Sequence, residues 1–289
     1  MAQQSTDTPA TAGGTITLGD LTVNRMGYGA MRITGKGVWG PPPDRAEAVR
    51  VLRRAVELGV NFIDTADSYG PNVSEEIIAE ALHPYPEGLV IATKGGFERP
   101  GPDNWQMNGR PDYLRRQLQG SLKRLKQDRI DLWQLHRIDP KVPAGEQFGA
   151  LAEFVREGLV RHVGLSEAGV KEIEAARKVV PIVSVQNRYN VLDREWESVV
   201  THCEREGIAF IPWYPLGGSG KGQAKLAKVE GVAKRLGIST LQLALAWLLA
   251  RSPAMLVIPG TSKTKHLEEN VAAVGVRLDE GTVRELDSK

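Results

Sequence analysis

The sequence has one cysteine, no long apolar run and almost no net charge. Cys203 alone cannot form an intrachain disulfide, and no cysteine and histidine spacing fits a zinc site, so we expect no metal. The longest apolar stretch, residues 241–250, is interrupted by Gln242 and is much shorter than a membrane span. The 37 basic and 35 acidic residues leave a net charge of +2 and are scattered, which argues against a nucleic-acid or membrane partner.

The amino-terminal segment lacks the basic and apolar regions of a signal peptide, and a single cysteine fits a reducing compartment, so we predict a cytoplasmic protein. Residues 1–14 are small and polar, with too few apolar side chains to offset the entropy of ordering. They predict a disordered leader, followed by one domain over residues 15–289. A chain of 289 residues is long enough to bury a large core without disulfides.

Short β-branched runs alternate with amphipathic segments along the domain. A hairpin is predicted over 15–23, and eight further strands are predicted at 26–30, 61–64, 89–93, 130–135, 160–165, 182–186, 208–213 and 255–258. Helical patterns between them have their own signals, such as the capping box of Asp44 with Glu47 and the stop at Gly59. This order predicts a single-domain (β/α)8 TIM barrel, an α/β fold, with an N-terminal β-hairpin. A doubly wound sheet with one miscounted strand is the alternative.

One glycine-rich motif matches the sequence pattern of a nucleotide-binding loop. Residues 35–40 read GKGVWG and match a dinucleotide fingerprint, but three prolines at 41–43 separate them from the helix that begins after Asp44. The glycines therefore cannot open a helix towards a phosphate, and we interpret the segment as a loop after the first barrel strand. The chain also lacks a Walker A sequence and a nucleophile elbow, which argues against phosphoryl transfer and serine hydrolysis.

Three polar residues interrupt apolar runs at the ends of predicted barrel strands. Asp64 ends the second strand, Lys94 follows the third and His136 follows the fourth, while Tyr69 lies in the loop beyond Asp64. Since the carboxyl ends of barrel strands meet at one face, we expect these four side chains to lie together there. An ion pair that only closes the top of the barrel is the structural alternative.

This group of residues is suited to deliver a proton. A phenol with a pKa near about 10 becomes a usable general acid when an ammonium group stabilises the phenolate and a carboxylate keeps that ammonium charged. Tyr69, Lys94 and Asp64 fit these three parts, and His136 could orient the same substrate oxygen. Such an acid can protonate the alkoxide formed when hydride reaches a carbonyl carbon. No amino-acid side chain donates hydride, so this chemistry requires a nicotinamide.

From Thr15 to its end the chain resembles the aldo-keto reductase family. The resemblance is carried by NFIDTADSYG at 61–70, VIATKGG at 90–96, DRIDLWQLHRID at 128–139, RHVGLSE at 161–167, VSVQNRYN at 183–190, PWYPLGG at 212–218 and IPGTSKTKHLEEN at 258–270. It implies a barrel reductase whose catalytic tetrad is Asp64, Tyr69, Lys94 and His136. The GPPPDR loop and the short carboxyl-terminal motifs resemble the bacterial pyridoxal-reductase-like branch of that family.

The resemblance also implies a cofactor site along the top of the barrel. Its nicotinamide end falls on Ser166, Glu167, Gln186 and Trp213, whose ring would stack on the nicotinamide. The whole predicted cofactor-binding set comprises Gly29, Ala30, Met31, Asp64, Ser166, Glu167, Gln186, Trp213, Tyr214, Pro215, Leu216, Gly217, Lys221, Gly260, Thr261, Ser262, Lys263, His266, Glu269 and Asn270.

Two positions depart from the family pattern. Glu167 stands where an asparagine usually helps to hold the carboxamide, and His266 stands where many relatives have an arginine near the adenosine phosphate. The stretch 260–266 nevertheless offers hydroxyls, the ammonium of Lys263 and no acid, and Lys221 could fold over the phosphates from the other side. We therefore predict NADPH as the cofactor, preferred over NADH.

Three further residues are candidates for the substrate pocket. Trp39 and Trp105 follow the first and third predicted strands and could wall an aromatic pocket, although either could equally cover the barrel top. Arg137 could bind an anionic group of the substrate, or it could form a salt bridge with a loop acid such as Asp139.

We therefore expect an NADPH-dependent oxidoreductase that reduces an aldehyde or ketone to an alcohol, with Tyr69 as general acid. Its partner is a small-molecule carbonyl compound, and we expect a monomer or a weak homo-oligomer. Two other functions stay open: a slow or non-catalytic nicotinamide-binding sensor on the same fold, and a Schiff-base enzyme that uses Lys94. The substrate is also open, between pyridoxal and bulky keto compounds such as keto-mycotoxins.

Overall fold

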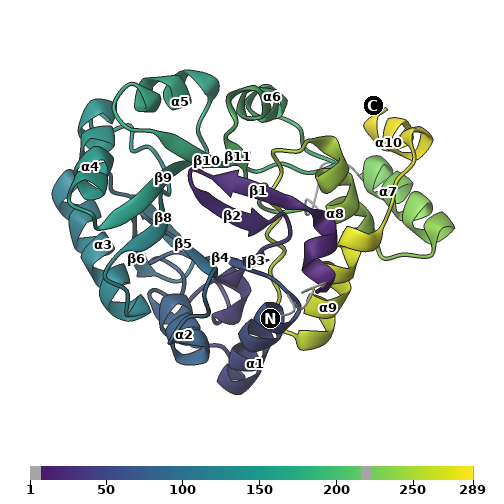
Figure 1. The fold of residues 1–289 in the computed structure, drawn as a ribbon, viewed down its shortest axis with the longest axis horizontal. Coiled ribbons are helices and arrows are strands. Elements are labelled where there is room, and N and C mark those ends of the chain that lie inside the picture. The colour runs from purple at the N-terminus through teal and green to yellow at the C-terminus, as the bar shows by residue number, and fades with distance from the viewer. Residues whose placement is uncertain (1–7, 216–222, 289) are drawn as a thin grey trace, which may run out of the picture.

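Seven parallel strands form a curled sheet that makes the wall of a barrel (Figure 1). The computed structural model describes residues 8–215 and 223–288 of the chain. In spatial order the strands are β11 (Ala209–Phe210), β10 (Ile182–Gln186), β9 (Val160–Ser166), β8 (Ile130–Leu135), β5 (Val90–Gly95), β4 (Phe62–Asp64) and β3 (Tyr28–Gly29). Every ladder in this sheet is parallel, as the alternation of strands and helices predicts.

The eighth predicted strand, at 255–258, joins the two edges of this sheet through single bridges. Met255 makes a parallel bridge to Phe210, and Val257 makes one to Met26. Backbone hydrogen bonds cross both seams: Leu256 N donates to Phe210 O at 2.9 Å, and Gly27 N donates to Val257 O at 2.8 Å. The predicted (β/α)8 barrel is therefore confirmed, although its eighth segment is less regular than the sequence indicated.

Helices surround the sheet (Figure 1). Buried apolar residues from their inner faces and from the outer face of the strands form one large core. The helices are α1 (Arg45–Glu57), α2 (Val73–Leu82), α3 (Pro111–Leu125), α4 (Ala144–Arg156), α5 (Val170–Arg177), α6 (Glu197–Glu206), α7 (Gln223–Leu236), α8 (Thr240–Arg251), α9 (Thr264–Ala272) and α10 (Glu280–Asp287), with short 3-10 helices η2 (Ala30–Ile33) and η3 (Ala273–Gly275).

The predicted capping box at the start of α1 forms only in part. Asp44 caps the helix, because its side chain accepts a hydrogen bond of 2.8 Å from the backbone N–H of Glu47. The Glu47 carboxylate does not return this contact. It accepts hydrogen bonds from the backbone N–H and the hydroxyl of Thr264, both at 3.0 Å. A residue of α1 therefore fixes the first turn of α9.

A β-hairpin closes the amino end of the barrel. β1 (Thr15–Leu18) and β2 (Leu21–Asn24) pair antiparallel around Gly19, whose φ of 65° suits the turn, so this prediction is confirmed. The two strands cross the barrel opening in Figure 1. Leu18, Leu21 and Val23 pack against inward-facing residues of the barrel strands in a second core cluster. This end is filled, which leaves the carboxyl end of the strands for a site.

The segment predicted as a disordered leader is partly ordered. Pro9–Gly13 form the 3-10 helix η1, in which Ala10 is fully buried and donates a backbone hydrogen bond of 3.0 Å to Leu58 O. The expectation of disorder is therefore wrong for residues 9–13. The composition of this segment did not predict its order, because the order comes from packing against a core that the rest of the chain builds. Residues 1–7 lie outside the described residues.

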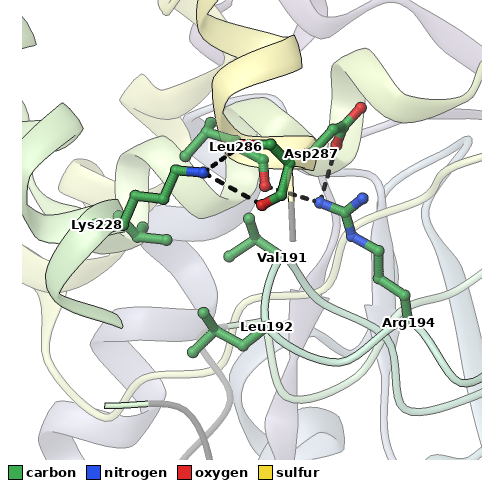
Figure 2. Close-up of a pocket in the computed structure, with 8 residues that line it drawn as sticks. Val191, Leu192, Arg194, Lys228, Leu286 and Asp287 are labelled. Atoms are coloured by element: carbon green, nitrogen blue, oxygen red, sulfur yellow. Dashed lines mark hydrogen bonds and ion pairs between the residues drawn. The ribbon is translucent and has the colours of Figure 1, made fainter. Parts of the chain in front are cut away.

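Two basic side chains hold the carboxyl-terminal segment (Figure 2). Lys228 of α7 donates hydrogen bonds to the backbone oxygen and the hydroxyl of Ser288, at 3.2 and 2.6 Å. Arg194, which follows β10, pairs with Asp287 of α10 at 2.9 Å. A cavity of about 180 Å³ lies among these residues. The contacts tie α10 both to α7 and to the loop at the top of β10.

In the part of the chain that the structure describes, no single helix is long and apolar enough to cross a membrane. The segments Leu226–Leu236 and Thr240–Arg251 reach that length and composition only as a pair, with a bend of 96° between them.

Candidate active site

The four predicted catalytic residues lie together at the carboxyl end of the barrel strands. Asp64 is the last residue of β4, Lys94 lies near the end of β5, and His136 directly follows β8. β5 is hydrogen-bonded to both β4 and β8, so these strand ends are neighbours. Tyr69 comes from the loop between β4 and α2 and is buried beside them.

Lys94 is the centre of this cluster and is fully buried. Its Nζ donates hydrogen bonds to Asp64 Oδ2 at 2.7 Å, to Thr65 O at 2.8 Å and to Tyr69 OH at 3.5 Å. The other carboxylate oxygen of Asp64 accepts a hydrogen bond of 2.8 Å from Gln186 Nε2. These partners provide what a buried ion pair requires, because two charges removed from water must be both paired and hydrogen-bonded.

Burial and neighbouring charges set the ionisation of the site. Burial opposes the charge of Lys94, but Asp64 and Tyr69 outweigh it and raise the pKa of Lys94. Burial also raises the pKa of Tyr69, against the opposing effect of Lys94, so the net direction is opposite to that expected from the lysine alone. Burial, followed by the charges of Lys94 and two arginines, holds the pKa of His136 well below its usual value. The site therefore holds a protonated phenol, an ammonium and a neutral imidazole.

Aromatic rings line the space around the tetrad. The ring of Trp105, a predicted substrate residue, lies 6.5 Å from the Tyr69 ring and 6.3 Å from the His136 ring, between centroids. Phe97 was missed by the sequence analysis, yet its ring lies closer, 4.7 Å from the His136 ring. Phe97 and Trp105 belong to a hairpin of β6 (Phe97–Gly101) and β7 (Asn104–Met107). The turn-forming PGPDN sequence at 100–104 is the signal that would have predicted it.

Arg99 of β6 fastens this hairpin over the barrel. Its guanidinium carbon lies 3.6 Å from the centroid of the Trp105 ring and 5.5 Å from that of Trp39. It donates hydrogen bonds to Ser68 O at 2.8 Å and to Gly37 O at 3.2 Å. Arg99 thus joins the loops that follow β3, β4 and β5, and it places Trp39 at the rim of the same site.

Arg137 lies beside the tetrad and is bonded to His136 and Ser166, in place of the alternative salt bridge with Asp139. Its NH1 donates hydrogen bonds to His136 O at 2.6 Å and to Ser166 Oγ at 3.0 Å. Asp139 instead accepts a hydrogen bond of 3.0 Å from the backbone N–H of Gly109. Across residues 8–215 and 223–288, the salt bridge between Arg137 and Asp139 is absent, because Arg137 turns back towards β9.

The residues predicted at the nicotinamide end lie at or just beyond the carboxyl ends of β9, β10 and β11. Ser166 and Gln186 end these strands and are buried. Glu167 has a left-handed backbone, with φ of 54°, and its Oε1 accepts hydrogen bonds from Trp213 Nε1 at 2.7 Å and from Arg188 N at 2.6 Å. The departure from asparagine at this position therefore has a structural consequence: Glu167 holds the edge of the Trp213 indole.

The predicted adenosine end lies where the eighth segment leads into α9. Gly29 and Gly260 pass close together: a Cβ on Gly29 would lie 2.6 Å from Ile258 O, and one on Gly260 would lie 2.7 Å from Gly29 O. Tyr28 OH donates a hydrogen bond of 2.5 Å to Thr261 O. This contact fixes the loop before the helix, and only glycine fits at the two crossing points.

The first turns of α9 carry polar groups suited to a ligand. Lys263 is its N-cap and is exposed, as is His266. The Lys263 backbone N–H donates to Thr261 Oγ1 at 3.1 Å. Asn270 is 2 % exposed, and within the described residues its Nδ2 has no hydrogen-bond partner. A buried donor without a partner is costly, so this amide fits an acceptor supplied by a bound molecule.

The other predicted cofactor residues are spread along the same rim. Ala30 and Met31 begin η2 directly after β3, Tyr214 and Pro215 follow Trp213, and Ser262 and Glu269 flank Lys263 and Asn270. Leu216, Gly217 and Lys221 lie outside the described residues. The described ranges contain no group of histidine, cysteine or acidic residues that could hold a metal ion.

Fold and site together define an α/β-barrel oxidoreductase. The chain belongs to the Aldo/keto reductase family, whose model matches residues 25–289. It is 52 % identical over 284 residues to an uncharacterized oxidoreductase of Schizosaccharomyces pombe, covering 97 % of this chain and 91 % of the relative. It is 44 % identical over 279 residues to pyridoxine 4-dehydrogenase of Escherichia coli K12, covering 94 % and 97 %.

Solved structures agree with the barrel. The thermostable aldo-keto reductase Tm1743, solved with the inhibitor epalrestat, superposes with a TM-score of 0.83 at 32 % identity, covering 94 % of this chain and 98 % of that one. An aldo-keto reductase from Klebsiella pneumoniae, solved with NADPH, gives a TM-score of 0.80 at 24 % identity, covering 94 % and 93 %, and shows the shared fold.

Proposed function

We propose that this chain is an NADPH-dependent carbonyl reductase that converts an aldehyde or ketone into an alcohol, with Tyr69 as the general acid. One observation carries the proposal. The buried Tyr69 hydroxyl lies 3.5 Å from the Lys94 ammonium, which is itself held 2.7 Å from Asp64. This arrangement suits proton transfer, because the ammonium stabilises the phenolate that remains after the proton has left.

The residues of the rim support NADPH as the cofactor. NADPH, when bound, supplies the hydride for the carbonyl carbon. Asn270 offers its unpaired amide donor, Lys263 offers positive charge at a helix amino-terminus, and Trp213 offers a ring for stacking. The barrel neighbour from Klebsiella pneumoniae was solved with the same cofactor.

The chain's own residues handle the proton. As negative charge develops on the carbonyl oxygen, Tyr69 transfers its hydroxyl proton to that oxygen. Lys94 stabilises the phenolate, and Asp64 keeps Lys94 charged. The Nδ1 of His136 faces Ser68 Oγ at 3.4 Å, which leaves its Nε2 to orient the same carbonyl oxygen.

The surroundings of Lys94 favour this role over Schiff-base chemistry. A lysine that attacks a carbonyl carbon must first lose its proton, and enzymes lower its pKa for that purpose. Here burial alone would lower the pKa of Lys94, but Asp64 and Tyr69 outweigh it and raise that pKa. Lys94 therefore acts as a fixed cation in this proposal.

Pyridoxal is the first substrate to test. The relative from Escherichia coli is named as a dehydrogenase that acts at position 4 of pyridoxine, and reduction of pyridoxal is the reverse of that reaction. Bulky ketones are the second group, because the aromatic rim could hold them as well. We also propose that the protein acts in the cytoplasm as a monomer or a weak homo-oligomer, which size-exclusion chromatography would test.

The deciding experiment follows the loss of NADPH fluorescence with a panel of pyridoxal, benzaldehyde and a keto-steroid, in the wild type and in Tyr69→Phe. We expect turnover of at least one aldehyde by the wild type and its near-complete loss in the variant. Tight NADPH binding with no turnover of any panel member would refute a reductase and support the sensor instead. Trapping of a substrate adduct by borohydride would support the Schiff-base alternative.

A further inference from the structure

The guanidinium of Arg137 lies beside the tetrad, with the Phe97 ring as a common neighbour of Arg137 and His136. Its NH1 donates to the backbone oxygen of His136 and to Ser166 Oγ, at 2.6 and 3.0 Å. Its guanidinium carbon lies 5.5 Å from the centre of the Phe97 ring, which in turn lies 4.7 Å from the His136 ring. A group bound to Arg137 would therefore lie close to the carbonyl carbon of a substrate held by His136.

Within residues 8–215 and 223–288, no carboxylate forms an ion pair with Arg137. Glu167 is near enough to affect its pKa, but the Oε1 of Glu167 is already bonded to Trp213 Nε1 and Arg188 N. Asp64 is paired with Lys94. The sequence between the described ranges, LGGSGKG at 216–222, contains no acidic residue.

A half-buried guanidinium without a directly bonded counter-ion is unfavourable, because the more distant charge of Glu167 offsets only part of the cost of losing water. Burial accordingly lowers the pKa of Arg137. In the described structure only its NH1 group donates hydrogen bonds, which leaves the Nε and NH2 edge for a ligand. An arginine edge with parallel N–H groups matches the two oxygens of a carboxylate.

Arg99, the second arginine at this rim, has a structural role and serves as a comparison for Arg137. Arg99 stacks on Trp105 and donates from Nε, NH1 and NH2 to the backbone oxygens of Asn104, Ser68 and Gly37. All three of its nitrogen groups are therefore used to hold β7 and two loops. In the described residues Arg137 makes no comparable set of contacts, although Phe97 connects it to the ring of His136.

We propose that the preferred substrate is a flat aromatic aldehyde that, unlike pyridoxal, carries a carboxylate near its carbonyl group, and that Arg137 binds this carboxylate. The rings of Phe97, Trp105 and His136 meet edge to face and form the walls for the flat part. The inference rests on the proposed function, since it names the substrate class of the same site. His136 is not the receptor for the anion, because its depressed pKa leaves it neutral.

The test compares matched pairs of aldehydes that differ only in charge: 3-formylbenzoate with 3-formylbenzamide, and 4-formylbenzoate with 4-formylbenzamide. In the wild type, kcat/KM for at least one carboxylate should exceed that for its amide by about tenfold or more, the scale of a charge-assisted hydrogen-bonded pair. Arg137→Met should remove this ratio, and Arg137→Lys should keep part of it. The ratio should fall with added salt and stay constant between pH 6 and 8.

A matched control is Arg188→Met, which removes a rim arginine that is already paired with Asp193 at 2.8 Å. It should leave the carboxylate-to-amide ratio unchanged. If both amides are reduced as well as the carboxylates, or if the ratio survives Arg137→Met, the inference is wrong while the proposed function stands. If Arg137→Met lowers both members of a pair equally, Arg137 only holds Ser166. Failure to reduce any aldehyde or ketone, including pyridoxal and the keto-steroid, would overturn the proposed function itself.

Discussion

At the scale of single residues, the protonation states of Lys94 and Tyr69 determine what chemistry the site can perform. Lys94 is fully buried, yet it stays charged because Asp64 lies 2.7 Å from it. Tyr69 is buried too, and burial raises its pKa despite the neighbouring lysine. The phenol is therefore protonated at neutral pH, with a cation beside it that in the proposed mechanism stabilises the phenolate.

Tyr69→Phe should remove the proton donor and leave the cofactor site intact. We expect kcat for the best aldehyde to fall by about 10²–10⁴, the usual worth of positioned acid catalysis. NADPH affinity, measured by quenching of tryptophan fluorescence, should stay within about twofold. A variant that kept more than half of the wild-type kcat would show that another group donates the proton.

Lys94→Met should nearly abolish activity and change the pH dependence of the remaining rate. Lys94 lowers the pKa of Tyr69, so its removal raises that pKa further. The phenol then keeps its proton to higher pH, and the alkaline limb of the reduction rate should move upwards. Because the single variant leaves Asp64 unpaired, the Asp64→Asn/Lys94→Met double variant serves as the folding control. An unchanged pH profile would argue against the role of Lys94.

Trp213→Ala should weaken binding of the oxidised cofactor by roughly tenfold, because the positively charged nicotinamide ring can no longer stack on the face of the indole. The melting temperature of the free protein should barely change. Glu167→Ala should reproduce part of the loss, since Glu167 holds the indole N–H at 2.7 Å, whereas Glu167→Gln retains an acceptor and should not. A large loss of stability with normal affinity would instead identify Trp213 as a core residue.

At the scale of elements, the amino-terminus of α9 depends on a residue from α1. The sequence near Lys263 offers no acid before Glu268, which favoured NADPH. The fold brings Glu47 there, and hydrogen bonds from Thr264, followed by the contact with Arg50, lower the pKa of Glu47 to about 2. A carboxylate that is ionised at neutral pH therefore lies at the turn that Lys263 caps.

These two charges should act in opposite directions on cofactor choice. Lys263→Ala should lower the preference for NADPH over NADH by roughly tenfold, because a cation near the 2′-phosphate is lost. Glu47→Gln should raise that preference a few-fold, because it removes a repelling charge and keeps an acceptor for Thr264. The measurement is kcat/KM for both cofactors at low salt. Equal use of both cofactors by the wild type would contradict this placement of the phosphate.

At the scale of the whole molecule, one end of the barrel is filled by the hairpin and the other by polar groups. Behind the tetrad, Glu75 pairs with Arg124 at 2.6 Å and accepts a hydrogen bond of 2.6 Å from Thr93. Asp67 is buried nearby, and within the described residues neither of its carboxyl oxygens has a hydrogen-bond partner. Burial, and then the charge of Glu75, raise the pKa of Asp67 well above its usual value.

This carboxyl group should make stability fall as the pH rises. In the unfolded chain Asp67 ionises above about pH 4, whereas in the folded protein it keeps its proton. Ionisation therefore favours the unfolded chain from about pH 4 upwards. Asp67→Asn has no proton to lose, so at pH 7 its Tm should exceed that of the wild type by roughly 2 °C or more.

The difference between Asp67→Asn and the wild type should vanish below pH 4, where Asp67 is protonated in both states. Glu75→Gln is the contrasting variant and should lower Tm at pH 7, because it breaks the buried pair with Arg124. A lower Tm for Asp67→Asn at pH 7 would show that Asp67 is ionised and stabilising in the folded protein.

The sequence by itself determined the parts of this protein that local patterns encode. β8 and β10 were predicted with the bounds they have, and the alternation of strands and helices predicted the barrel. The same alternation predicted that Asp64, Lys94 and His136 would meet, because strand ends of a parallel barrel share one face. These features depend on periodicity and on residues that lie close together along the chain.

Only the tertiary structure decided the contacts between distant segments. The Glu47 carboxylate accepts a hydrogen bond from Thr264, and does not complete the predicted capping box. Arg137 donates to Ser166 and, in the described part of the chain, forms no salt bridge with Asp139. Glu167 accepts a hydrogen bond from the indole N–H of Trp213. The eighth segment pairs through single bridges, and η1 is ordered by a core that other segments build. The physical reason is that each polar side chain has several possible partners, and the packing of the whole barrel sets the distances that select one of them.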